Sequence, residues 1–325
     1  MTIELTRRLL LRLASASSLA VAAGAAVRAE GTEGTARGAV GPTFANRTPM
    51  RIGMVTLRVS DPDLVADFYR DVIGLTVMER TQTGTRLGSE GIPLVNLERR
   101  AEASREARDA AGLYHTAFLM PTRKDLARWL VHVAKNHIPL SGFADHRVSE
   151  SVYLDDPEGN GIEVYADRAP ELWQWTSGSV TMASDRLDVD DLLKLTDARV
   201  SAYPKAPDGL RIGHIHLRVG DLEHAEGFYN GLIGLMPTRR INGASFLSSG
   251  HYHHHLAANV WRSAGAGHRD DMATGLAWFS LEIEGQDVLD TQEKRLRQAG
   301  TQTAELTNGI ETVDPWGTRV QLIKV

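Results

Sequence analysis

Alternation of apolar and polar residues marks the start of two similar stretches of the chain. Residues 51–59, RIGMVTLRV, and residues 211–219, RIGHIHLRV, both alternate with a period of two, which is typical of a strand. In each stretch a predicted helix follows, which begins after an aspartate cap and carries a Phe-Tyr pair on its inner face. A Gly-Leu turn and further strand-like segments come next. The pattern therefore predicts a strand and a helix followed by additional strands.

The same two stretches are related in sequence, which indicates an internal duplication. Residues 51–80 and 211–240 share Arg-Ile-Gly, Leu-Arg-Val, an aspartate, Phe-Tyr and Ile-Gly-Leu in one register. Two further units, starting at Gly112 and Gly275, match this template less closely. We therefore predict an α+β chain of four βαβββ modules, at residues 51–100, 112–168, 211–262 and 275–325, with a connector at 169–210.

The first fifty residues have a different composition. An arginine pair, Arg7–Arg8, precedes an apolar, alanine-rich stretch, and small residues flank Arg28 as they do at a signal cleavage site. Residues 1–29 resemble a twin-arginine export signal, which predicts an exported or periplasmic protein with no membrane insertion once the signal is removed. The alternative is a cytoplasmic protein with an amphipathic N-terminal helix. Residues 30–50 are predicted to be a disordered tether.

Composition narrows the chemistry that the chain can use. It has 325 residues, of which 42% are hydrophobic, so two domains with cores of their own are feasible. The net charge of −5 gives no electrostatic reason to expect nucleic acid as a partner. Since there is no cysteine, disulfides and thiolate ligands are excluded, and a metal would need His, Asp or Glu. A homo-oligomer is left open.

Four segments together carry a resemblance to a known family. They are GLYH, DHRVSESVYLDDPEGNGIEVYADR, IGHIHLRVGDL and GHYHHHLAAN, which start at residues 112, 145, 212 and 250. In this combination the chain resembles the catechol 2,3-dioxygenase branch of the vicinal oxygen chelate superfamily. The resemblance covers nearly everything after residue 50. It implies two cupped mixed-sheet barrels, each built from two modules, with a metal held inside a cup.

In that superfamily the ligands come from the first and last strands of the modules. The corresponding positions here are Met54, His115, His214 and Trp278 in the first strands, with Glu163 and Gln321 in the last. His115, Glu163 and His214 provide the two imidazoles and one carboxylate of non-haem Fe(II) oxygenases. Met, Trp and Gln suit a divalent cation poorly. We therefore expect modules 2 and 3 to pair around the metal and modules 1 and 4 to pair around a metal-free, packed core.

The family also implies acid–base groups beside the metal. His146 and Tyr153 lie between His115 and Glu163, with Tyr153 ten residues before the glutamate, which resembles the family spacing. A histidine run occupies the last strand of module 3, where the family has another histidine. Alignment favours His254 as the acid–base residue, but strand alternation leaves two neighbours open. The predicted catalytic residues are His146, Tyr153 and His254, and the predicted substrate-binding residues are His216, His253 and His255.

These assignments imply an extradiol dioxygenase that cleaves a small aromatic diphenol with O2. The cofactor would be Fe(II) or Mn(II), since both accept these ligands. Two alternatives keep the same fold. One is a metal-dependent isomerase or lyase of the superfamily, which would more often use four protein ligands. The other is a small-molecule binding protein without catalysis, which export from the cytoplasm would favour.

Overall fold

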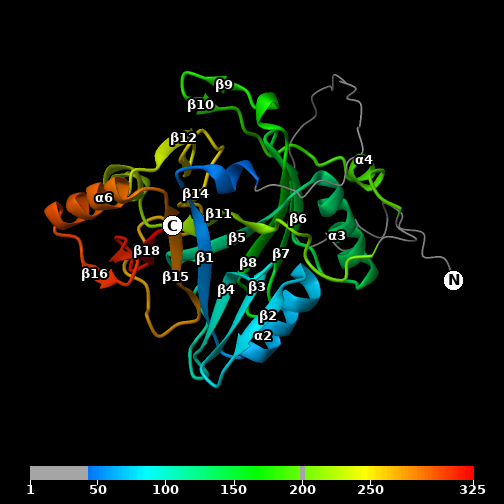
Figure 1. The fold of residues 1–325 in the computed structure, drawn as a ribbon, viewed down its shortest axis with the longest axis horizontal. Coiled ribbons are helices and arrows are strands. Elements are labelled where there is room, and N and C mark those ends of the chain that lie inside the picture. Colours follow the sequence, from blue (N-terminus) through cyan, green and yellow to red (C-terminus); the bar gives the residue numbers. More distant parts are fainter. Residues whose placement is uncertain (1–42, 198–201) are drawn as a thin grey trace.

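The computed structural model describes residues 43–197 and 202–325. The predicted signal at 1–29, and the tether up to residue 42, lie outside the described residues. Among the described residues, no helix has both the length and the apolar character needed to cross a membrane. Figure 1 shows two β-sheets that cross near the middle of the molecule, with helix α6 (Gln286–Gln298) at one end and α4 (Val189–Leu193) towards the other.

The predicted α+β fold of four βαβββ modules is confirmed, and its strands form two eight-stranded mixed sheets. Modules 2 and 3 contribute the sheet ordered β12-β13-β14-β11-β5-β8-β7-β6, which we call the central-module sheet. Its strands are β5 (Gly112–Met120), β6 (Gly142–Asp145), β7 (Ser149–Asp155), β8 (Gly161–Asp167), β11 (Arg211–Arg218), β12 (Met236–Ile241), β13 (Ala244–Ser248) and β14 (Leu256–Asn259). The two modules meet along the antiparallel pair β5–β11.

Modules 1 and 4 contribute the other sheet, ordered β16-β17-β18-β15-β1-β4-β3-β2, which we call the terminal-module sheet. Its strands are β1 (Met50–Val59), β2 (Thr76–Arg80), β3 (Gly84–Ser89), β4 (Ile92–Arg99), β15 (Gly275–Ile283), β16 (Thr303–Leu306), β17 (Gly309–Val313) and β18 (Arg319–Lys324). Strands β1 and β15 form its antiparallel centre. The first and last modules of the chain therefore share one sheet.

Three of the four module helices begin at side-chain caps, whereas α6 begins after Gly285. Asp61 caps α2 (Pro62–Phe68) and Asp221 caps α5 (Leu222–Glu226), each accepting hydrogen bonds from backbone N–H groups of the first turn. Thr122 does the same for α3 (Arg123–Lys135). Helices α2 and α5 each continue into a π-helical turn, η2 (Tyr69–Ile73) after α2 and η4 (Gly227–Leu232) after α5. The predicted aspartate caps of modules 1 and 3 are thus present.

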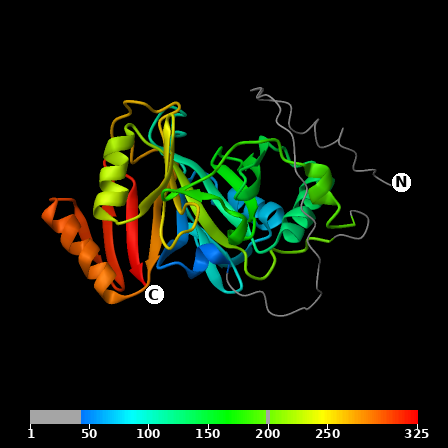
Figure 2. The same cartoon turned by 90° about the horizontal axis from the view of Figure 1, so that it is seen from above.

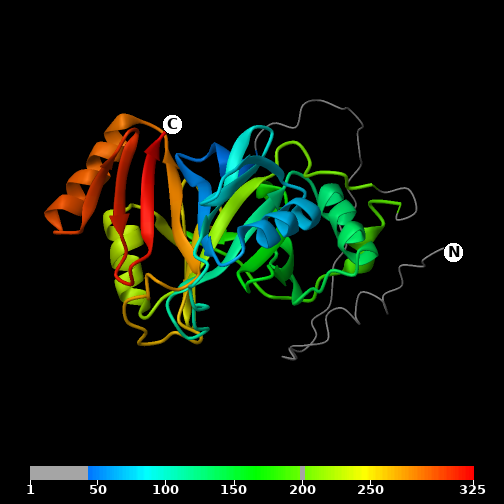
Figure 3. The same cartoon turned by 90° about the horizontal axis from the view of Figure 1, so that it is seen from below.

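The helices pair differently from the strands. The Trp129 indole of α3 donates to the carbonyl of Val72 in η2, which joins module 2 to module 1. In the same way, Gln292 of α6 donates to the carbonyl of Ile233 after η4, which joins module 4 to module 3. Each module therefore shares a sheet with one neighbour and a helix contact with another. Figures 2 and 3 show the resulting arrangement from above and below.

One face of each sheet is buried in a common apolar core. Ile52 and Leu57 of β1 belong to the same buried cluster as Ile212 and Leu217 of β11. A register irregularity between Ile52 and Val55, and another between Ile212 and His214, shifts the alternation by one residue. Residues on either side of it can therefore face the same core although they are an odd number of positions apart. The opposite face of the central-module sheet is curled around the candidate site described below.

The opposite face of the terminal-module sheet differs from the prediction of a packed core. Met54, Trp278 and Gln321 are only half-buried there. Polar contacts hold this face together: Gln321 donates to Glu311 over 2.9 Å, and the Ser280 hydroxyl accepts from the backbone N–H of Met54 over 2.8 Å. This face is therefore half-exposed and carries polar contacts, and it is not a packed apolar core.

The predicted disorder of residues 30–50 is wrong for the described end of that segment. Residues 44–47 form the short helix η1 (Phe44–Arg47), and strand β1 already begins at Met50. The Phe44 ring packs against Trp173 and Tyr252, with centroids 5.6 and 6.1 Å apart. Composition suggested disorder, but the Phe44 ring and the contacts of His255 with Thr48 and the carbonyl of Ala45 attach this stretch to the sheet.

The connector 169–210 does more than join the halves. It forms a hairpin of β9 (Trp175–Thr176) and β10 (Ser179–Val180), followed by the short helix α4. Between them, the backbones of Asp145 and Asp185 form an isolated bridge to the edge strand β6. The connector is therefore attached to the rim of the central-module sheet.

Candidate metal centre

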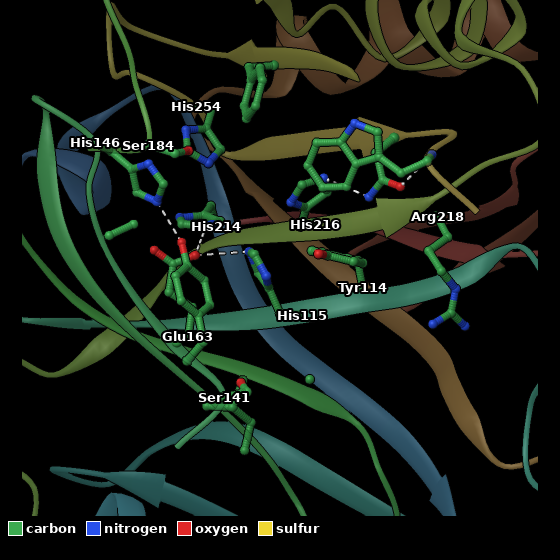
Figure 4. A pocket seen from close by; sticks show the side chains of 18 of the residues that line it. Tyr114, His115, Ser141, His146, Glu163, Ser184, His214, His216, Arg218 and His254 are labelled. Carbon is green, nitrogen blue, oxygen red and sulfur yellow. Dashed lines mark hydrogen bonds and ion pairs between the residues drawn. The ribbon is translucent and has the colours of Figure 1, made fainter. Parts of the chain in front are cut away.

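Three adjacent strands at the middle of the central-module sheet bring together the predicted ligands. His115 lies on β5, His214 on β11 and Glu163 on β8. The ligand atoms of all three lie within 4.8 Å of one another, and the three side chains are buried (Figure 4). No other cluster of this kind is present in residues 43–197 and 202–325. Positions far apart in the sequence thus form one compact group.

Contacts within the group fix the orientation of the carboxylate. Glu163 Oε2 lies 3.0 Å from His115 Nε2 and 3.2 Å from His214 Nε2. The other oxygen, Oε1, accepts a hydrogen bond of 2.6 Å from the Ser151 hydroxyl. Ser151 therefore occupies one carboxylate oxygen and leaves the second directed at the two imidazoles, as an outer partner of a metal ligand does.

Burial and charge set the protonation of these groups. Burial would raise the pKa of the Glu163 carboxyl, but the neighbouring His214 and His115 outweigh it and hold this pKa well below its ordinary value. Burial lowers the pKa of His214 to about 4, against an opposing effect of Glu163. At neutral pH the carboxylate is therefore ionised and His214 is neutral, which is the state in which both coordinate a cation.

The group fits a divalent metal ion. His115 Nε2 is fully buried yet makes no hydrogen bond of proper geometry with the described residues, although Glu163 Oε2 is close. A buried nitrogen without a partner is costly, and a cation between the three ligand atoms would satisfy it. Two imidazoles and one carboxylate suit Fe(II) or Mn(II).

His146 and Tyr153 form a hydrogen-bonded pair beside the ligands. His146 Nδ1 lies 2.6 Å from the carbonyl oxygen of Ala183, so this nitrogen carries the proton. The other nitrogen, Nε2, is 2.6 Å from the Tyr153 hydroxyl, which then donates to it. Burial, with the charge of Glu163 adding to it, raises the pKa of the Tyr153 phenol well above its ordinary value. Tyr153 is therefore a neutral phenol.

The histidine run just before β14 is buried. Only His254 lines the cavity beside the ligands, and its ring centroid lies 4.1 Å from that of His214. Its Nδ1 is 2.8 Å from His253 Nδ1, and His253 Nε2 is 2.9 Å from Asp167. Because a carboxylate only accepts, His253 directs the N–H of its Nε2 at Asp167, and its Nδ1 accepts from His254 Nδ1. The remaining nitrogen of His254 is then unprotonated.

His253 and His255 differ from the prediction that they bind substrate. Neither lines the cavity, and both side chains are fully buried. His255 Nε2 lies 3.0 Å from the Thr48 hydroxyl, and its Nδ1 lies 3.0 Å from Ser248. The run was predicted to lie in the last strand of module 3, but it precedes β14 and bends at His253 and His255. Only its middle residue reaches the cavity.

His216 lies in the cavity wall next to the ligands. It stands directly opposite His115 in the β5–β11 pair, and their ring centroids are 4.9 Å apart. Asn259 lies 2.9 Å from His216 Nε2. Burial lowers the pKa of His216 well below its ordinary value. This side chain is therefore placed to contact a bound molecule, and its ring packs against that of His115.

The cavity has a volume of about 760 Å³, which is within the range of small-molecule sites. Several of its walls were not predicted from the sequence. Residues 182–184 of the connector contribute one side, and Phe246 and Trp261 contribute another. Trp261 follows the histidine run closely, which offered a signal, but nothing in residues 182–184 indicates a cavity wall. Four arginines also line it: Arg108, Arg218, Arg239 and Arg262.

A protein-family model matches this chain over residues 51–164 and 211–322, which are the two pairs of consecutive modules in the sequence. This chain belongs to the glyoxalase/bleomycin resistance protein/dioxygenase superfamily. Members of the superfamily carry out different reactions, so membership leaves the reaction to be argued from the site.

Individual members of the superfamily are similar to this chain to different degrees. The catechol-2,3-dioxygenase of Bacillus subtilis (strain 168) is 35% identical over 269 residues, which cover 81% of this chain and 93% of that protein. Among solved structures, glyoxalase I from Zea mays matches with a TM-score of 0.53 at 14% identity, covering 86% of this chain and 94% of its own. A Bacillus subtilis structure matches with a TM-score of 0.59 at 13% identity, covering 85% and 86%. These two structural matches concern the fold alone.

Proposed function

We propose that this protein is an extradiol dioxygenase, which opens the ring of a catechol-type diphenol with O2. One observation supports this most strongly. A buried set of two histidines and one glutamate lies in the same cavity as the hydrogen-bonded His146–Tyr153 pair and the His254 ring. The 35% identity to a catechol-2,3-dioxygenase supports the same reaction.

In this proposal His115, His214 and Glu163 hold the metal. When bound, Fe(II) or Mn(II) would bring the diphenol oxygens and O2 together and allow electrons to pass between them. The residues around the ligands have their own tasks. Ser151 keeps Glu163 turned towards the histidines, and His216 contributes an imidazole wall. Three protein ligands leave positions open for the diphenol and O2.

Protons are managed on two sides of the cavity. On one side, the neutral Tyr153 hydroxyl donates to His146 Nε2, and His146 is held by the Ala183 carbonyl. This pair can accept a substrate hydroxyl proton and return it later. On the other side, the unprotonated nitrogen of His254 is available as a base. His253 and Asp167 act as positioning residues, since they fix which nitrogen of His254 is free.

The proposal is tested by metal content together with O2 uptake. The full chain is purified without oxygen, its Fe and Mn are quantified, and catechol and O2 are then added. We expect close to one metal per chain, consumption of O2 only with the diphenol, and a yellow ring-opened product. His214→Ala should abolish all three. Met54→Ala, which changes the corresponding position of the terminal-module sheet, should leave them intact.

Two other results would change the conclusion. Metal without O2 uptake on any diphenol would favour an isomerase or binding role for the same site. A protein that takes up no metal after anaerobic reconstitution would overturn the metal centre itself.

A further inference from the structure

The cavity carries an excess of positive charge on its walls. Four arginines line it, and the carboxylates among its lining residues are Glu163 and Asp155. Glu163 is engaged with the two ligand histidines. This leaves Asp155 to balance the arginines from within the cavity. A pocket for unsubstituted catechol would not need this charge, because the ring carries no group for an arginine to bind.

Three of the four arginines are explained without a ligand. Arg218 donates to Glu106 over 2.6 Å and to the carbonyl of Ala110 over 2.9 Å, so its side chain is held in place by the protein. Arg108 and Arg262 are exposed to water. Exposed guanidinium groups are solvated, and their presence alone does not indicate a binding partner.

Arg239 has no such explanation. Its Nε is fully buried and makes no hydrogen bond with any residue in 43–197 or 202–325, and no ion pair of Arg239 occurs within those residues. The neighbouring Arg240 offers a direct contrast, because its guanidinium pairs with Glu226 over 2.6 Å. Since arginine stays protonated, the buried Nε is a donor of a charged group that is left without an acceptor, and the half-buried side chain lines the cavity.

The strand register places Arg239 on the cavity side of β12. Arg239 stands opposite Phe246 in the β12–β13 pair, and both residues line the cavity, as does Ile241 two positions later. The Phe246 ring lies 5.1 Å from that of His254 and 6.1 Å from that of His216. Arg239 therefore lies next to Phe246, whose ring packs against His216 and His254 beside the candidate metal ligands.

We propose that Arg239 binds an anionic substituent, so that the ring substrate is a diphenol with a carboxylate side chain. A carboxylate presents two oxygens that match the planar donor fork of a guanidinium. The aromatic ring would lie along Phe246, with its hydroxyl oxygens towards the ligand group and its carboxylate towards Arg239. This inference rests on the proposed ring-cleaving function, which supplies the diphenol part of the substrate.

Two diphenols that differ in charge test the inference. They are 3,4-dihydroxyphenylacetate and the neutral 4-methylcatechol, compared by the ratio of their kcat/KM values in the Fe-loaded full chain. We expect this ratio to favour the acid and to fall about tenfold in Arg239→Met, since hydrogen bonds to a charged group carry that much affinity. Arg239→Lys should retain part of the preference. Arg240→Met, on the opposite side of the same strand, should retain all of it.

Calorimetry without O2 separates this inference from the proposed function. The acid 4-hydroxyphenylacetate and neutral 4-methylphenol are titrated into the same variants, where no ring cleavage is needed. Tighter binding of the acid that depends on Arg239 supports the subsite even if no diphenol is turned over. Cleavage of both diphenols with equal efficiency, or a ratio unchanged in Arg239→Met, overturns the subsite while the ring-cleaving function stands. Absence of any acid preference in binding also overturns it.

Discussion

The two sheets are built from the same module, but only one of them gathers metal ligands. Their registers correspond position by position. In the central-module sheet His115 stands opposite His216, and Glu163 stands beside Ala117. In the terminal-module sheet Trp278 stands opposite Thr56, and Gln321 stands beside Ser280. The backbone frame is thus shared, and the difference lies in the side chains.

The comparison extends to the residue beside the carboxylate. Tyr153 pairs with Glu163 across β7 and β8, while Glu311 pairs with Gln321 across β17 and β18. In the central-module sheet a phenol, Tyr153, lies beside the carboxylate of Glu163. In the terminal-module sheet the carboxylate of Glu311 accepts a hydrogen bond of 2.9 Å from the Gln321 amide. The fold therefore supplies positions, and the residue types at those positions supply chemistry.

The largest expected effect comes from making one sheet resemble the other. Glu163→Gln places in the central-module sheet the amide that the terminal-module sheet has. Loss of the anionic ligand should remove most of the bound metal and lower kcat/KM by more than the roughly 10–100-fold that changes to outer partners cause. Metal analysis and O2 uptake measure both. Gln321→Ala is the matched control, and the comparison fails if both variants lose metal to the same extent.

Tyr153→Phe is expected to have the next largest effect. It removes the hydroxyl that donates to His146 but leaves the three ligands in place. We expect metal content to be unchanged and kcat to fall about 100-fold, which is within the range for loss of an acid–base group. Glu311→Gln, the counterpart position, should leave kcat unchanged. A Tyr153→Phe protein with full activity would assign the tyrosine a packing role only.

A smaller effect is expected on stability from the paired tyrosines of the helices. The Tyr229 hydroxyl donates to the buried Asp314 carboxylate over 2.8 Å. Its counterpart in the repeat, Tyr69, makes no hydrogen bond with Asp156 in the corresponding turn, where Asn160 occupies that carboxylate instead. Tyr229→Phe should therefore lower the free energy of unfolding by about 2 kcal/mol, and Tyr69→Phe by less. Urea denaturation measures the difference, and equal losses would contradict it.

The smallest expected effect is a pH dependence of stability that arises from Asp156, in the turn before β8. Burial raises the pKa of Asp156 to about 6, against about 4 in an unfolded chain. The folded state therefore binds a proton between pH 7 and pH 5 that the unfolded chain does not bind. Through this group the free energy of unfolding should rise by about 1 kcal/mol as the pH falls over that window. Asp156→Asn should remove this increment, and an identical pH profile in the variant would argue against it.

The arrangement of strands and helices could be predicted from the sequence because it is repeated in four modules. Equivalent positions in four modules pointed to His115, Glu163 and His214, and the structure brings these three together. The histidine run was harder to interpret, since alternation separates His254 from its neighbours but does not say which side faces the cavity. Only the packing of Thr48 and Ser248 on His255 makes that clear.

Other features had no local signal at all. The cavity wall at 182–184 depends on how the connector returns to the sheet edge at Asp145. The lack of an acceptor for Arg239 Nε is visible only after β12 is paired with β13. In the sequence, Arg239–Arg240 is typical of an ordinary charged strand end. Contacts between segments far apart in the sequence determine both the cavity wall and the surroundings of Arg239. No local sequence pattern contains that information.

The order of the modules along the chain also bears on how the protein folds. Both halves of the central-module sheet come from consecutive modules, so its strands can pair while the last module is still being synthesised. The terminal-module sheet must wait, because β1 near the start of the chain pairs with β15 near the end. Long-range closure of this kind is slow. We therefore expect the cavity to be assembled early, with β1 left as an unpaired strand edge until synthesis is complete.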